Sequence, residues 1–206
     1  MNFKAVHLYL SSICLVGFVT LACGSPPISG AMEVSGGALR EARKLWNTTA
    51  SSLDQTYTYV RLKSSFTGHT DITVVRFEKG ELTARLFKRI QVGVDQGERK
   101  VKVLESFLAV PRMKRLFAGE GGFPGLSMEE LYDACEREVI SKDPKEYHLG
   151  VGVHENGALK QCYYSPRNCA DDCSTNYGVA FFYDHAVSDE ALQEFLKTPT
   201  TVLEKK

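Results

Sequence analysis

The sequence has no excess of charge of either sign, because 25 basic side chains balance 25 acidic ones. A nucleic-acid binder needs a concentrated basic face that neutralises phosphates, and no basic block is present. Beyond the first two dozen residues the chain also lacks an apolar run of the about 20 residues that cross a membrane. These absences exclude a nucleic-acid-binding and a membrane-embedded protein, whereas the 43% of hydrophobic residues suffices for a globular core.

Motifs that carry catalysis or bind metal ions are also missing. The sequence contains no G-x-S-x-G nucleophile elbow and no H-E-x-x-H pair, and the Gly-rich run 119–125 lacks the Gly-Lys-Ser/Thr ending of a phosphate loop. Asp171 and Asp172 lack the alternation of a calcium-binding loop, so a solvated acidic loop is favoured there. We therefore expect a non-enzymatic protein without a metal or a cofactor.

The N-terminal residues 1–22 have the composition of a secretory signal peptide. They contain no acidic residue, and an apolar stretch runs from Leu8 to Ala22. The residues around Cys23 resemble a bacterial lipobox, although Thr20 stands where the usual leucine would be, and Cys23 would then be acylated. Cleavage before Ser25, which would release a soluble secreted protein, and an uncleaved anchor are the alternatives.

The rest of the chain divides by composition. Residues 23–37 are rich in Gly, Ser and Pro and are typical of a flexible tether. Residues 38–197 contain all the periodic segments and are expected to form a single domain, followed by a polar tail at 198–206.

Four of the six cysteines lie between Cys135 and Cys173. In an exported protein, Cys135, Cys162, Cys169 and Cys173 are expected to form two disulfides. A zinc site is the alternative, but the spacing lacks a C-x2-C knuckle. Three pairings are open, and we favour Cys135 with Cys162, because Cys135 would face the sheet from a helix and Cys162 lies on a strand. Cys169 would then pair with Cys173.

The hydrophobic periodicity predicts an α+β fold. Helices are expected at 38–50, 128–140 and 189–196, and strands at 55–64, 71–77, 81–90, 147–153, 158–165 and 177–184, with a short element near 101–110. The order predicts an antiparallel sheet built from two helix-plus-meander halves, with its helices on one face. Residues 91–126 would be a long Gly-rich insertion.

The predicted strands are rich in aromatic residues. Strand propensity and core packing account for most of them. Tyr57, Tyr59, Tyr147 and Tyr163 are the candidates for an exposed binding face, because tyrosine combines a large contact area with a polar tip.

The order of elements resembles a family of uncharacterised bacterial lipoproteins and secreted proteins that share a domain of unknown function. The resemblance covers roughly residues 38–184 and is carried by Trp46, Tyr57-Thr58-Tyr59, the hairpin from Ile72 to Leu82, the helix start Ser127–Tyr132 and the strand pair from Tyr147 to Ser165. It implies a location in the cell envelope, and it carries over no catalytic or binding residue.

These observations together predict a non-enzymatic envelope lipoprotein. Its expected partners are a membrane, reached through the N-terminal lipid, and an envelope protein or polymer of unknown identity. A small secreted inhibitor-like module is the second hypothesis, because helix-on-sheet folds often block enzymes with a loop. A hydrolase ranks last, since the sequence offers no paired nucleophile and base.

Overall fold

The computed structural model describes residues 36–95, 98–111, 121–169 and 173–198. All of them belong to one compact unit, Ala31–Lys206. The predicted signal peptide, Cys23 and the tether as far as residue 35 lie outside the described residues. So do Asp171, Asp172 and the tail beyond residue 198.

The first sheet has five antiparallel strands. Four of them follow one another along the chain: β1 (Tyr57–Ser64), β2 (His69–Glu78), β3 (Glu81–Asp95) and β4 (Glu98–Ala109). The fifth, β8 (Phe181–Tyr183), comes from near the other end of the chain and pairs with the free side of β1. The strand order is therefore β4-β3-β2-β1-β8.

The second sheet has three antiparallel strands in sequence order, β5 (Tyr147–Val153), β6 (Leu159–Pro166) and β7 (Thr175–Asn176). Its hairpin turns at Gly157, which has a φ of 81° that favours glycine. A Cβ there would lie 2.5 Å from the backbone nitrogen of Trp46, so the turn packs directly on the first helix.

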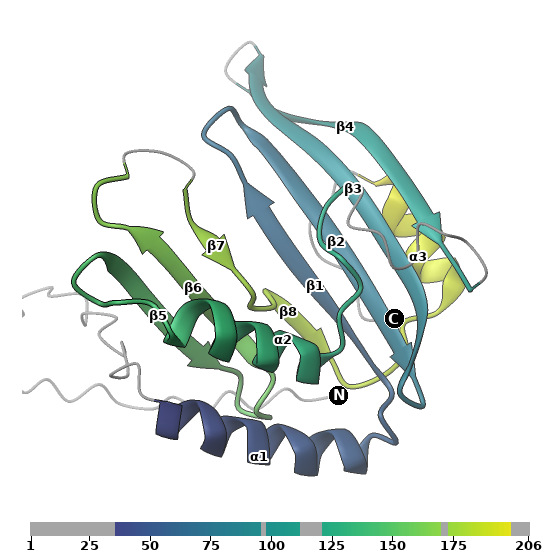
Figure 1. Cartoon of the computed structure of the whole chain (residues 1–206). Coiled ribbons are helices and arrows are strands. Elements are labelled where there is room, and N and C mark those ends of the chain that lie inside the picture. Colours follow the sequence, from purple (N-terminus) through teal and green to yellow (C-terminus); the bar gives the residue numbers. More distant parts are fainter. Residues whose placement is uncertain (1–35, 96–97, 112–120, 170–172, 199–206) are drawn as a thin grey trace, which may run out of the picture. The chain divides into compact units, whose positions relative to one another are not determined.

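Three helices cover the sheets. They are α1 (Gly36–Ser52), α2 (Met128–Cys135), which continues into a π-helical turn η2 (Glu136–Ile140), and α3 (Asp189–Lys197). A capping box starts α2, where Ser127 and Glu130 exchange hydrogen bonds. Figure 1 shows α1 and α2 on one side of the first sheet and α3 on the other.

The two faces of the first sheet have separate cores. We call the side that carries Tyr57, Tyr59, Arg61, Arg85 and Phe87 the cleft face. Its core is shared with α1, α2 and the second sheet and includes Trp46, Val75, Phe77, Met128, Leu131, Tyr132, Cys135, Leu159, Cys162 and Val179. The opposite side, the α3 face, packs on α3 through Val60, Ile72, Val74, Leu86, Ile90, Leu192 and Phe195.

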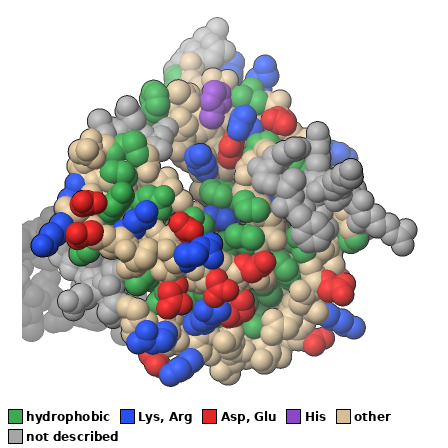
Figure 2. Space-filling model, in the orientation of Figure 1, with side chains coloured by type: hydrophobic (Ala, Val, Ile, Leu, Met, Phe, Trp, Pro, Cys, Tyr) green, Lys and Arg blue, Asp and Glu red, His purple; other side chains and the backbone are tan. Residues whose placement is uncertain are grey.

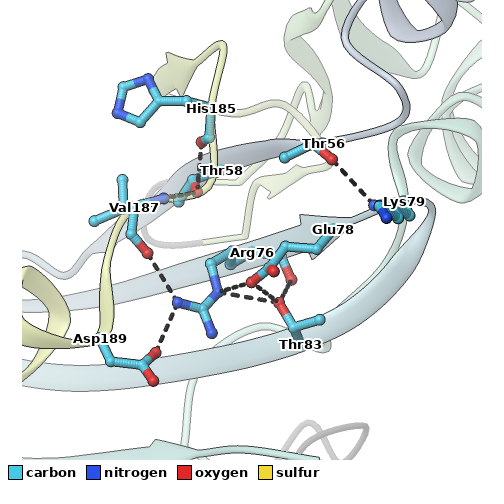
Figure 3. A network of polar contacts seen from close by, with 9 residues as sticks. All are labelled: Thr56, Thr58, Arg76, Glu78, Lys79, Thr83, His185, Val187 and Asp189. Carbon is cyan, nitrogen blue, oxygen red and sulfur yellow. Dashed lines mark hydrogen bonds and ion pairs between the residues drawn. The ribbon is translucent and has the colours of Figure 1, made fainter.

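A polar network fastens the segment before α3 to the α3 face (Figure 3). Arg76 Nη1 donates to the Val187 carbonyl at 2.9 Å and to the Asp189 carboxylate at 2.7 Å, and its Nε lies 3.0 Å from Glu78 Oε1. The Thr58 hydroxyl accepts from the Val187 N–H at 3.0 Å. This end of α3 is therefore held by charge-assisted bonds as well as by apolar packing.

The structure has the predicted mixed α+β class with antiparallel strands, but the arrangement differs from the expected one. The strands form two sheets rather than one, the helices lie on both faces of the first sheet, and a strand from the second half completes the sheet of the first. The expected insertion at 91–126 includes the end of β3 and all of β4.

The predicted strand at 177–184 is divided because the chain changes sheets there. Tyr177 and Val179 donate their N–H groups to carbonyls of β6, whereas the Ala180 N–H donates to the Val60 carbonyl of β1. Only residues 181–183 then pair as β8.

Candidate functional site

The predicted tyrosine face does not exist as an exposed surface. Tyr57 and Tyr59 are only 3% and 0% exposed, because α1, α2 and the segment 121–127 cover the cleft face. The Tyr57 ring packs edge-on against Trp46 at 5.1 Å and stacks on Phe77 at 5.2 Å between centroids. Burial raises the pKa of Tyr57 to about 12. Both tyrosines belong to the core.

The other two tyrosines lie on opposite sides of the second sheet. Tyr147 makes an edge-to-face contact with Tyr164, at 5.7 Å between centroids. Tyr163 pairs with Gly150 on the other side, where its ring fills the space that a Cβ would occupy. Both are half-buried. The four tyrosines therefore do not converge on one surface.

The four described cysteines form two disulfides, joined in the pairs that the sequence favoured. Cys135 of α2 bonds to Cys162 of β6, with 5.8 Å between the Cα atoms, and this link fastens α2 to the second sheet. Cys169 and Cys173, four residues apart, close a short loop. Disulfides persist in oxidising compartments, so these bonds are typical of an exported protein.

A cleft between the two sheets was not predicted. It has a volume of about 320 Å³ and is lined by Arg61, Leu62, Lys63, Ser64, Phe123, Pro124, Leu126, Ser174, Thr175, Asn176 and Tyr177. The lining combines aromatic and aliphatic side chains with hydroxyls and two cations, and none of these residues is acidic. Figure 2 shows hydrophobic side chains between the two sheets, and interspersed charges of both signs over the helices.

Arg61 is the buried cation of this cleft. It belongs to the covered row of β1 with Tyr57 and Tyr59, and it is only 2% exposed. One of its terminal nitrogens donates to the Asn176 carbonyl of β7, and its guanidinium carbon lies 3.7 Å from the centroid of the Phe123 ring. Its Nε is buried and has no acceptor among the described residues. Burial lowers the pKa of Arg61 to about 10, so it is charged at neutral pH.

The segment 121–127 crosses the cleft face and holds Phe123 over Arg61. It starts at Gly121 and Gly122, whose φ values are 59° and 91°. A Cβ on Gly122 would lie 2.4 Å from Thr73 Oγ1 and 2.6 Å from the Phe87 ring, so only glycine fits this approach to the sheet.

Hydrogen bonds from the sheet then fix the position of Phe123. Its N–H donates to Thr73 Oγ1 at 3.0 Å, and its carbonyl accepts from Arg85 Nε at 2.7 Å. Further along the segment, the Tyr59 hydroxyl donates to the Leu126 carbonyl. The aromatic wall of the cleft is therefore anchored on both sides of the ring.

Two further findings concern the described residues alone. They contain no cluster of three or more His, Cys, Asp or Glu side chains arranged to hold a metal ion. None of their helices has the length and apolarity to cross a membrane.

One signal in the sequence pointed to the cleft. The alternation of β1 places Arg61 on the same face as Tyr57 and Tyr59, and a charged residue in a covered row requires a special environment. Phe123 lies within the Gly-rich run 119–125, where no periodic pattern marks it.

Comparisons of the chain with protein-family models, with curated proteins and with solved structures found no match. The site is therefore interpreted from its own residues.

Proposed function

We propose that this chain is a non-enzymatic binding module of the bacterial cell envelope, anchored to a membrane through acylated Cys23. In this proposal the cleft between the two sheets holds part of an envelope protein or polymer. The resemblance to uncharacterised lipoproteins agrees with this function.

Two features support export and anchoring. The apolar residues 8–22 precede a small-residue site at Cys23, as in bacterial lipoproteins. Cys135, Cys162, Cys169 and Cys173 are consumed by disulfides, so Cys23 is not needed to pair with any of them. Each buried methylene of an acyl chain contributes about 0.8 kcal/mol, so several chains would give stable anchoring.

The observation that carries the binding function is the cleft floored by Arg61. Burying an arginine costs desolvation energy, and Arg61 has neither a carboxylate partner nor an acceptor for its Nε among the described residues. The cleft also combines apolar walls with a few converging polar groups, as small-molecule and peptide sites do.

Labelling with radioactive palmitate in a bacterial host tests the anchor. The full chain and its Cys14→Ala variant should both incorporate label, whereas Cys23→Ala should incorporate none. Label that persists in Cys23→Ala would contradict acylation at this residue. Unlabelled protein in the culture medium would instead support soluble secretion.

Capture of envelope components on the immobilised chain tests the cleft. Ser174 is exposed and lines the cleft, so Ser174→Trp should block it and weaken capture at least about tenfold. Ser51→Trp is the matched control, because Ser51 is exposed on α1 outside the cleft lining. Equal capture by both variants would exclude the cleft as the binding site. A captured enzyme that the chain inhibits would favour the inhibitor-like module.

A further inference from the structure

The Nε of Arg61 is a buried hydrogen-bond donor without a described acceptor. Buried polar groups in folded proteins are nearly always satisfied, and leaving a charged group unsatisfied is costly. The one hydrogen-bond acceptor that the structure gives this guanidinium is the Asn176 carbonyl, which is neutral. The cation therefore has hydrogen-bonding capacity and charge left for a ligand.

Arg76, the corresponding cation of the α3 face, shows what a structural arginine looks like in this protein. It contacts two carboxylates, those of Glu78 and Asp189, and also donates to the Val187 carbonyl. No carboxylate forms an ion pair with Arg61 among the described residues, and none of the described residues that line the cleft is acidic. Arg61 is buried as Arg76 is, at 2% and 8% exposed, but among the described residues it has neither a counter-charge nor an acceptor for its Nε.

The other residues that line the cleft indicate the chemistry and size of the rest of the ligand. Phe123 covers one side of the guanidinium, and Pro124, Leu126 and Tyr177 extend the apolar wall. A volume of about 320 Å³ lies at the small end of ligand sites. Lys63 adds a second positive charge to the lining.

We infer that the cleft binds a carboxylate attached to an apolar or aromatic group, with the carboxylate at Arg61 and the apolar group against Phe123 and Tyr177. This inference rests on the proposed binding function and names its ligand class. A carboxylate accepts from guanidinium nitrogens in a planar arrangement, and such bonds are stronger than those to neutral acceptors. A free carboxylate and the C-terminus of a partner chain both present this chemistry.

A pair of probes with the same body tests the charge requirement on the full chain with both disulfides formed. N-acetylphenylalanine carries the carboxylate, and N-acetylphenylalaninamide replaces it with a neutral amide. Calorimetric titration should show that the acid binds at least about tenfold more tightly than the amide. Equal affinities, or no binding of the acid, would overturn the inference.

Variants then assign the preference to Arg61. Arg61→Met should reduce the preference for the acid to less than about twofold, and Arg61→Lys should recover only part of it, because lysine lacks Nε and the planar fork. Lys44→Met removes an exposed charge from α1 and should keep the full preference. A preference that survives in Arg61→Met would overturn the assignment. The comparison of probes on the unmodified chain stands even if Arg61→Met does not fold.

A hexapeptide ending in phenylalanine distinguishes the two ligand sources. Tighter binding of the peptide than of N-acetylphenylalanine assigns the cleft to a chain terminus, and equal binding assigns it to a small carboxylate. Both results support the carboxylate chemistry. If the Ser174→Trp variant loses envelope capture but the probes show no preference for the acid, the binding module stands and the carboxylate inference fails.

Discussion

The two faces of the first sheet bury arginines in opposite ways. On the α3 face, Arg76 is surrounded by the carboxylates of Glu78 and Asp189, and its bonds fix the cover of that face. On the cleft face, Arg61 has one neutral carbonyl, that of Asn176, and an aromatic ring. Both side chains are buried, so burial alone does not separate their roles. They differ in the hydrogen-bond acceptors that surround them.

The covers of the two faces differ as well. The described part of α3 is held on its face by packing, by the Arg76 network and by Lys88, whose Nζ donates to the carbonyls of Phe195 and Thr198 at 2.8 and 2.9 Å. The cover of the cleft face includes the disulfide between Cys135 and Cys162. The face with the candidate site is therefore the one that is locked covalently.

Removing this disulfide should have the largest effect on stability. Cys135→Ala with Cys162→Ala opens a loop with a sequence separation of 27, and it should lower the free energy of unfolding by about 3–4 kcal/mol. The pair Cys169→Ala with Cys173→Ala, separated by 4, should cost about 2 kcal/mol. Urea denaturation of both double variants measures the difference. Equal losses of unfolding free energy in the two double variants would show that the disulfide of the cleft face stabilises the protein no more than the short-loop disulfide does.

Replacing the two arginines tests the comparison directly. Arg76→Met leaves two carboxylates and the Val187 carbonyl without their donor, and it should lower the free energy of unfolding by about 2–3 kcal/mol. Arg61→Met removes an unsatisfied donor and leaves no carboxylate without a partner. The free energy of unfolding should therefore change by no more than about 1 kcal/mol. A larger loss for Arg61→Met than for Arg76→Met, measured by thermal denaturation, would reverse the roles assigned to them.

The crossing segment over the cleft face offers a smaller test. Gly122→Ala places a Cβ against Thr73 and Phe87 at a φ of 91° and should cost about 2 kcal/mol. Gly93→Ala is the control, because nothing lies within 4 Å of a Cβ there, and its effect should stay within about 0.5 kcal/mol. Gly122→Ala should also weaken ligand binding in the cleft, since it displaces Phe123. Unchanged stability would show that the segment does not pack as described.

The pH dependence of Lys88 gives an effect that appears only above about pH 8. Burial lowers the pKa of Lys88 to about 8, compared with about 10.4 in the unfolded chain. Between these pH values the unfolded state binds more protons, so the free energy of unfolding should rise with pH by up to about 1.4 kcal/mol per unit. This rise should disappear in Lys88→Met. Urea denaturation at pH 8, 9 and 10 measures it, and parallel curves for both proteins would contradict it.

Local structure could be predicted where single residues determine it. Ser127 and Glu130 form the capping box that their spacing predicts, and Gly157 adopts the positive φ that an Asn-Gly turn requires. The favoured pairing of Cys135 with Cys162 followed from a helix stripe that faces a strand. In each case the physical cause lies within a few residues of sequence or in one periodic face.

The site could not be predicted, because its cause is the covering of one face by a distant segment. The alternation of β1 places Tyr57, Tyr59 and Arg61 on one side, but it does not say whether that side meets water. The cover is the segment 121–127, nearly all of which falls in the expected Gly-rich insertion at 91–126. Its Gly122 is the residue that allows the backbone to approach Thr73 and Phe87.

The division into two sheets also escaped prediction. Tyr177 to Tyr183 has the composition of one strand, but its first residues bond to β6 and its last ones to β1. Amino-acid composition indicates that a segment forms a strand, but it does not indicate with which strand each residue pairs.

The pairing of β8 with β1 limits the order in which the strands of an exported chain can assemble. Thr58 and Val187 share a hydrogen bond across 129 residues of sequence. In a chain threaded through a membrane from its N-terminus, β1 to β4 reach the far side long before β8 and α3. Until then β1 has an open edge and the α3 face exposes its apolar side chains, both of which invite aggregation. In a chain exported in this way, the residues delivered last therefore complete the fold.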